Sequence, residues 1–139
     1  MSDSSIARSA SCSCGALQLH VNGDPVRVSV CHCLACQQRT GSVFGAQARF
    51  ARDRVTQPPC DQARQYVRKG DSGGTATFTF CSACGATVHW HLDGLPDFIM
   101  IAVGAFADPS FPKPTFSIYE DRRHAWAQVP AGDDVEHWD

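Results

Sequence analysis

Residues 75–92, TATFTFCSACGATVHWHL, place two runs of alternating side chains on either side of a cysteine turn. A period of two is the pattern of a β-strand that has one buried face. Between the runs, Cys81-x-x-Cys84-Gly85 is typical of a metal-binding knuckle, a tight turn that aims both sulfur atoms inward. Gly85 supplies the backbone freedom that such a turn needs. This stretch therefore predicts two strands that meet at a metal-binding turn.

The same alternation recurs along most of the chain. It predicts further strands over residues 17–21, 26–30, 43–50, 65–69, 98–103 and 115–119. The turn signal at residues 22–25 indicates that the first two of these form a hairpin. One helical turn could follow Cys36 and stop at Gly41. We therefore predict an all-β fold of stacked or partly closed antiparallel sheets.

The length of 139 residues indicates one domain with a modest core. We expect a flexible N-terminal arm over residues 1–10, a zinc-binding β domain over 11–129 and a loose polar tail over 130–139. Lysine and arginine are scattered, and the formal net charge is −2, which argues against a nucleic-acid partner. We also expect no membrane partner and a cytoplasmic location, because no segment resembles a membrane span or an export signal.

Seven of the eight cysteines fall into three tight clusters. The clusters are Cys12-x-Cys14-Gly15, Cys31-His32-Cys33-x-x-Cys36 and the knuckle Cys81-x-x-Cys84. In a reducing compartment such clusters more often bind metal than form disulfides, and tetrahedral zinc is the usual occupant. The two pairs together would close one four-sulfur site, whose expected role is fold stability. The remaining trio would hold a second zinc ion with one corner open to water or a ligand.

The second site could instead be closed, with Cys60 or a histidine as its fourth ligand. Cys60 lies in a proline-rich loop, and we expect it to be a free thiol. His20, His89 and His91 alternate with apolar residues, which predicts that they line the outer faces of strands. The sequence contains no phosphate loop, dinucleotide fingerprint or paired-carboxylate motif.

Three motifs occur in a fixed order along the chain. They are Cys12-x-Cys14-Gly15, then Cys-His-Cys-x-x-Cys-Gln-x-x-Thr-Gly-Ser over residues 31–42, then Phe80-Cys81-x-x-Cys84-Gly85. This set resembles the glutathione-dependent formaldehyde-activating enzyme family, also called centromere protein V-like, over about residues 11–127. The resemblance implies a compact zinc-stabilised β-tent with two zinc ions. It implies a structural zinc on Cys12, Cys14, Cys81 and Cys84, and a catalytic zinc on Cys31, Cys33 and Cys36.

The resemblance also implies a carbon–sulfur lyase that joins formaldehyde to the small-molecule thiol glutathione, in either direction. Three thiolates leave a net charge of about −1 at the metal, which favours thiolate handling over making hydroxide from water. The residues that follow the trio directly are candidates for binding substrate: Gln37, Arg39, Thr40 and Ser42. No pair of arginines that could clamp the carboxylates of the tripeptide is evident in the sequence.

Two other functions fit the same motifs. A non-catalytic, zinc-stabilised binding module would keep its second metal buried and fully ligated. A zinc-buffering or thiol-redox protein would lose the metal of the trio reversibly and would oxidise Cys31, Cys33 and Cys36.

Overall fold

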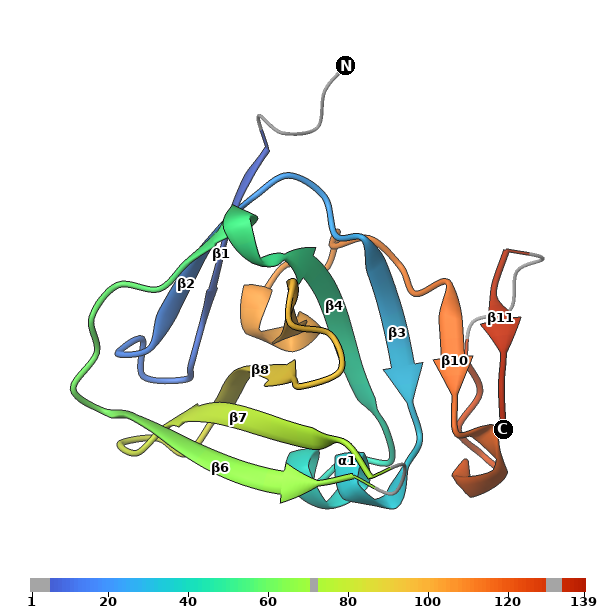
Figure 1. Cartoon of the computed structure of the whole chain (residues 1–139). Helices are drawn as coiled ribbons and strands as arrows, with labels where there is room; N and C mark the ends of the chain where they lie inside the picture. Colours follow the sequence, from blue (N-terminus) through green and yellow to red (C-terminus); the bar gives the residue numbers. More distant parts are fainter. Residues whose placement is uncertain (1–5, 71–72, 130–133) are drawn as a thin grey trace.

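The structure is a computed structural model that describes residues 6–70, 73–129 and 134–139, and its strands form two sheets (Figure 1). The smaller sheet contains β1 (Ala7–Ser11), β2 (Gln18–Asn22) and β5 (Val55–Thr56), in the order β1-β2-β5. The larger sheet contains β3 (Arg27–Cys31), β4 (Gly45–Ala51), β6 (Ala63–Lys69), β7 (Thr75–Cys81), β8 (Thr87–Leu92), β9 (Phe98–Ala102), β10 (Phe116–Ile118) and β11 (Glu136–His137). Its order is β11-β10-β3-β4-β9-β8-β7-β6, and the prediction of an all-β fold is confirmed.

One α-helix lies in the described part of the chain, α1 (Leu34–Thr40), together with short 3₁₀ helices at Arg52–Arg54, Val103–Phe106 and Glu120–Arg122. The helix α1 begins at Cys33, whose Sγ accepts a hydrogen bond from the N–H of Cys36 at 3.2 Å. It ends at Gly41, which has a left-handed φ of 71°. The sequence predicted this end but not the start, because cysteine is not among the usual N-cap residues. None of the described helices is long and apolar enough to cross a membrane.

The core lies where the smaller sheet packs on the larger one. Leu19 and Val21 of β2 are buried against Phe50 of β4 and Ile101 of β9, as the alternation along these strands predicts. The ring of Phe50 lies 6.0 Å from that of Phe106, which closes the end of this core. Burying these side chains is the main favourable term for joining the two sheets.

The predicted hairpin between residues 17–21 and 26–30 is wrong. The strand β2 pairs with β1 and β5, whereas β3 pairs antiparallel with β4 and parallel with β10. The turn at residues 22–25 therefore carries the chain from one sheet to the other, and the N–H of Val26 donates to the carbonyl of Arg49 at 2.7 Å. The turn residues indicated a change of direction, but they did not specify the pairing partner of each strand.

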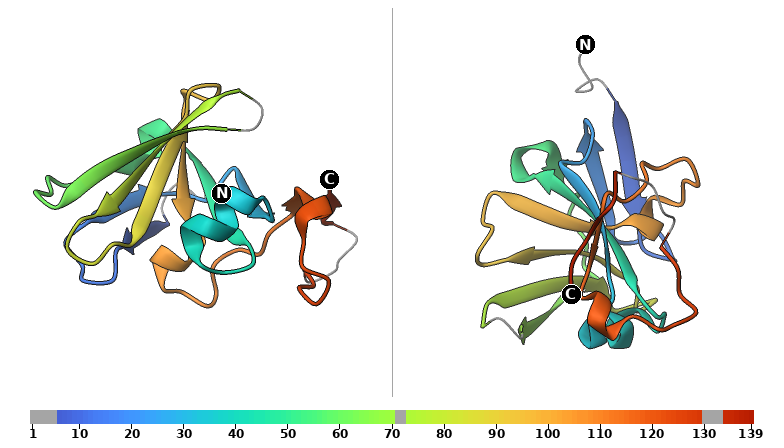
Figure 2. Two further views of the ribbon diagram at one scale, coloured as in Figure 1. Left: turned by 90° about the horizontal axis from the view of Figure 1, so that it is seen from below. Right: turned by 90° about the vertical axis from the view of Figure 1, so that its right-hand side faces the viewer.

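The two ends of the chain contribute strands. We expected a flexible arm over residues 1–10, but Ala7–Ser11 form β1, which pairs with β2 and buries Ala10. Residues 1–5 lie outside the described part. Within the tail expected over residues 130–139, Glu136–His137 form β11, which pairs parallel with β10; residues 130–133 lie outside the described part. Figure 2 shows this C-terminal segment (orange to red) at the side of the larger sheet.

The pair β7–β8 presents different side chains on its two faces. Phe78 pairs with Trp90 on one face, and Thr79 pairs with His89 on the other. We expected His89 on an outer face, but only 9% of its surface is exposed. This expectation was wrong because the smaller sheet and the loop after β5 cover that face. Each face of the pair therefore borders a cavity.

Candidate metal centres and the cavity beside the trio

Four cysteines from distant parts of the chain come together at one end of the core. The Sγ atoms of Cys12, Cys14, Cys81 and Cys84 all lie within 4.8 Å of one another. The Sγ of Cys14 lies 3.7 Å from those of Cys12 and Cys81. Four thiolates on one tetrahedral zinc, with bonds of about 2.3 Å, would be separated by about 3.8 Å. The four-sulfur group therefore has the dimensions of a site for one metal ion.

Two similar turns position these four sulfur atoms. Gly15 and Gly85 both have a φ of +84°, the left-handed conformation that favours glycine. The N–H of Cys12 donates to the carbonyl of Leu17, and the N–H of Leu17 donates to Cys12 Sγ at 3.2 Å. Hydrogen bonds from the backbone N–H groups of Ala86 and Cys14 lower the pKa of the Cys84 thiol to about 6. The knuckle thus favours the thiolate form of Cys84, the form that a metal requires.

The trio is built locally, at the junction of β3 and α1. Cys31 is the last residue of β3, Cys33 caps α1, and Cys36 lies in the first turn of the helix. Their Sγ atoms lie within 4.8 Å of one another, and those of Cys33 and Cys36 are 3.1 Å apart. The intervening His32 is fully buried, and its Nε2 lies 3.1 Å from Ser117 Oγ of β10.

The three thiols of the trio strongly shift one another's pKa values. Hydrogen bonding with Cys31 and then with Cys36 lowers the pKa of Cys33, whereas hydrogen bonding with Cys33 raises the pKa of Cys31. Three thiols this close cannot all ionise at neutral pH without a compensating positive charge. A bound cation would supply that charge, so the trio also fits a metal ion.

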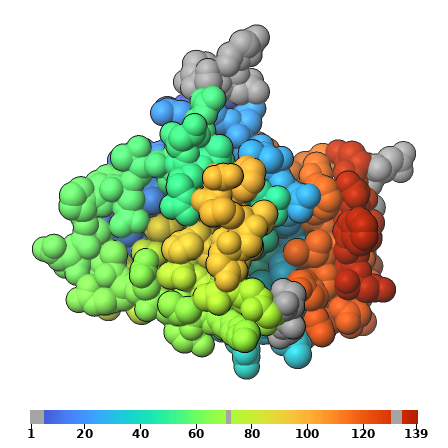
Figure 3. Space-filling model, in the orientation of Figure 1, coloured from blue at the N-terminus to red at the C-terminus, as the bar shows by residue number. Residues whose placement is uncertain are grey.

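The trio borders a cavity of about 380 Å³ whose wall carries three arginines. They are Arg39 of α1, Arg49 of β4 and Arg68 of β6. The guanidinium carbon of Arg39 lies 4.3 Å from the ring centroid of Trp90, which fixes this charge against an aromatic surface. The turn between β8 and β9, seen in yellow and orange at the centre of Figure 3, also borders the cavity through Leu95.

These arginines have no carboxylate partner among the described residues. None of the three appears in an ion pair there, and the buried Nε of Arg49 has no hydrogen-bond partner in that part of the chain. Burial, and then the charge of Arg27, lowers the pKa of Arg49. Arg49 is half-buried, and its guanidinium carbon lies 5.6 Å from the ring centroid of Phe98. A buried N–H group without a hydrogen-bond acceptor is costly, and an anionic ligand would offset that cost.

The other three predicted substrate residues have different surroundings. The side chain of Gln37 donates to the carbonyls of His32 at 2.9 Å and Arg122 at 3.1 Å, and its Oε1 lies 2.9 Å from His124 Nε2. Thr40 donates to the carbonyl of Cys36, and it accepts from the N–H of Ser42. Only Arg39 of the four lines the cavity, and Cys60 belongs to neither cysteine group.

Arg49 and Arg68 were missed by the sequence analysis. They occupy alternating positions in β4 and β6, a signal that places each on one face of its strand. That signal does not say which strands flank the trio. The pairing of β3 with β4 and of β6 with β7 brings the two arginines there.

An all-β fold with two cysteine groups, each able to hold a metal ion, defines a class of small β-proteins built around thiol sites. The chain belongs to the glutathione-dependent formaldehyde-activating enzyme family, whose model matches residues 7–122. Its fold is also similar to the crystal structure of a Rhodobacter sphaeroides protein, with a TM-score of 0.57 and 19% identity over 73% of this chain and 91% of that one. Comparison with curated proteins gives no match.

Proposed function

We propose that the chain is a zinc-dependent carbon–sulfur lyase-type enzyme that acts on a thiol–aldehyde adduct such as S-hydroxymethylglutathione. The observation that carries the proposal is a three-thiol group beside a cavity whose arginines lack carboxylate partners among the described residues. Membership of the family supports it. We assign a structural zinc to the four-sulfur group and a catalytic zinc to Cys31, Cys33 and Cys36. At the trio, zinc would supply a Lewis acid with an open coordination position.

The arginines explain how the chain could hold such a substrate. Glutathione carries two carboxylates, and three guanidiniums border the cavity. Charge-assisted hydrogen bonds from Arg39 and Arg68 to these groups would hold the thiol sulfur beside the trio. The ring of Trp90, already in contact with Arg39, would exclude water from one side of the bound thiol.

The reaction needs no oxidant or reductant. In the direction of synthesis the sulfur of the thiol attacks the aldehyde carbon, a C–S bond forms, and the carbonyl π bond breaks. The proton of the thiol ends on the carbonyl oxygen, and the product is a hemithioacetal. Reversal of these steps cleaves the adduct. The role we propose for the protein is to keep the thiol deprotonated and aligned.

Replacement of Arg39 by glutamine should raise the KM for the glutathione adduct about tenfold or more, with a smaller change in kcat, because a charge-assisted hydrogen bond to a carboxylate is lost. Exchange NMR of formaldehyde with glutathione would measure both parameters. Arg54→Gln is the matched control, since Arg54 is exposed and does not line the cavity. Equal kinetics for the two variants would exclude Arg39 as a substrate ligand.

A thiol-redox or zinc-buffering function is the second candidate. It is favoured by the short separation of 3.1 Å between the Sγ atoms of Cys33 and Cys36. This function predicts that mild peroxide forms a disulfide within the trio as the metal leaves, whereas a lyase should lose activity on the same treatment. Mass spectrometry of the treated protein, read beside the exchange assay, separates the two.

The cellular setting we propose is the reducing cytoplasm, with glutathione as the small-molecule partner. All eight cysteines are free, and seven of them belong to the two thiol groups. Oxidation of either group would remove its metal ligands. A compartment that keeps thiols reduced is therefore the one in which both proposed zinc sites persist.

A further inference from the structure

A second cavity, of about 590 Å³, lies on the opposite side of β7–β8 from the trio. Thr79 of β7 and His89 of β8 project into it, whereas their neighbours Phe78 and Trp90 border the cavity of the trio. Leu19 of β2 also lines it, so the space lies between the two sheets. We call it the inter-sheet cavity. It shares no lining residue with the cavity of the trio.

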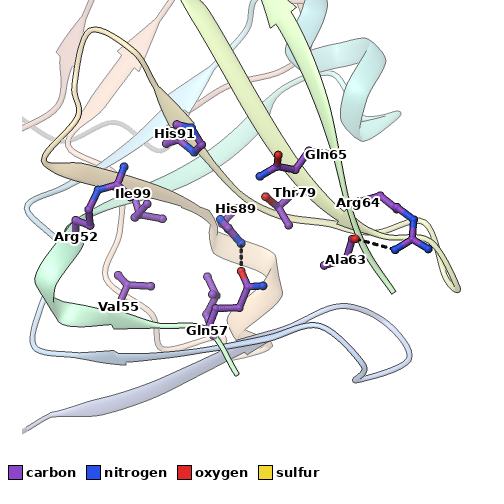
Figure 4. Close-up of a pocket in the computed structure, with 11 residues that line it drawn as sticks. Arg52, Val55, Gln57, Ala63, Arg64, Gln65, Thr79, His89, His91 and Ile99 are labelled. Atoms are coloured by element: carbon purple, nitrogen blue, oxygen red, sulfur yellow. Dashed lines mark hydrogen bonds between the residues drawn. The ribbon is translucent and has the colours of Figure 1, made fainter. Parts of the chain in front are cut away.

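Polar groups converge on one side of this cavity. Figure 4 shows Gln65, Thr79, His89 and His91 pointing toward a common space. The Nε2 of His89 lies 2.8 Å from Gln57 Oε1, which fixes the orientation of the ring. Burial, and then the charge of His91, lowers the pKa of His89 to about 4, so this imidazole is neutral at neutral pH. The ring is therefore a fixed, neutral part of the wall.

The charge of the wall is of one sign. No Asp or Glu occurs among the described residues that line the inter-sheet cavity, whereas Arg52 and Arg64 both do. Arg64 donates to the carbonyls of Asp61 at 2.7 Å and Ala63 at 2.9 Å, and Figure 4 shows its guanidinium turned toward Ala63. Within the described part of the chain, the side chain of Arg52 donates only its Nε–H, to the carbonyl of Pro96 at 2.8 Å. The terminal N–H groups of Arg52 thus remain for an anion.

The rest of the wall is apolar. Leu19, Val55 and Ile99 come from three different strands or their ends and lie beside the polar groups. A cavity of this volume, with an apolar surface and a few convergent polar groups, is the usual form of a small-molecule site. A purely inorganic anion would leave the apolar side unfilled. A cation would meet no negative side chain among the described lining residues.

We propose that the inter-sheet cavity binds a small organic acid, with its apolar body against Leu19, Val55 and Ile99 and its carboxylate toward Arg52. The imidazole of His91 and the hydroxyl of Thr79 would form hydrogen bonds with polar atoms of the same ligand. The site is separate from the trio, so its occupancy does not depend on the lyase activity.

The test is an amide NMR titration of the full chain with benzoate, and with benzamide as the uncharged ligand of the same shape. Benzoate should cause saturable shifts at Thr79, His89 and His91 with a Kd of roughly 1–10 mM, the range expected for so small a ligand. Benzamide should bind at least about fivefold more weakly, because it cannot make the charge-assisted contact. The variant Arg52→Gln should remove this preference, and Arg52→Lys should restore most of it.

Three controls make the result specific. Arg54→Gln, at the end of the same 3₁₀ segment as Arg52 but outside the cavity, should keep the preference for benzoate. Cys36→Ser should also keep it, which would show independence from the trio. The proposal is overturned if no saturable shifts occur at the lining residues, if the shifts map to Arg39 and Arg68 instead, or if benzamide binds as tightly as benzoate.

Discussion

Cys36→Ser should lower turnover of the thiol–aldehyde adduct by at least about a hundredfold while leaving the chain folded. The serine hydroxyl is a much poorer zinc ligand than a thiolate, and the proposed catalytic ion would lose one of its three protein ligands. The fold should survive because Cys36 lies on the short helix α1, away from the four-sulfur group and from the core beneath the smaller sheet.

Two measurements separate this effect from unfolding. Zinc analysis should fall from about two ions per chain toward about one, while the circular dichroism spectrum stays unchanged. Cys60→Ser is the matched control, since Cys60 is a half-buried thiol that belongs to neither group. If the Cys36→Ser variant turns over the adduct as fast as the parent protein, the trio has no role in catalysis.

Cys81→Ser should instead destabilise the whole domain by several kcal/mol, a fraction of the roughly 10–16 kcal/mol that a structural zinc site supplies in small zinc proteins. Cys81 is fully buried at the end of β7, and its partners Cys12 and Cys14 follow β1. Loss of the proposed structural zinc would therefore release the connection between the smaller and the larger sheet. The melting temperature should fall by roughly 10 °C or more.

Ser82→Ala is the control for Cys81→Ser, because Ser82 is exposed in the same turn and lies outside the four-sulfur group. Its melting temperature should stay within a few degrees of the parent, as is usual for exposed positions. Removing zinc from the parent protein with a chelator should lower its melting temperature by about as much as Cys81→Ser does. If Cys81→Ser has the same melting temperature as the parent protein, the four-sulfur group does not stabilise the fold.

Grouping of the cysteines could be predicted from the sequence because the signal is local. Cysteines two or three residues apart lie close together wherever the chain goes next. The strand geometry from which we predicted that Cys12 and Cys14 point the same way does not apply, because both residues lie in the turn after β1. For Cys31, Cys33 and Cys36, this short spacing was enough to predict one shared site. For the two pairs, counting ligands against the four corners of a zinc site suggested the partnership, and the structure brings Cys14 and Cys81 within 3.7 Å.

Arg49, Arg68, the true pairing of β2 and β3, and the burial of His89 were not predictable in this way. Each depends on which strands lie side by side, and alternation along one strand carries no information about its neighbours. Arg68 reaches the trio only because β6 and β7 pair. His89 is enclosed only because the smaller sheet and the loop after β5 lie over its face of β8.

The strands β7 and β8 act as a partition with a different chemistry on each side. Aromatic rings face the trio, and a hydroxyl and imidazoles face the inter-sheet cavity. Because neighbouring residues in a strand project oppositely, adding or deleting one residue in either strand would move the following side chains of that strand from one lining to the other. Relatives of this chain can therefore diversify either compartment by point substitution, but the spacing from Ala76 to Thr79 should tolerate no change in length.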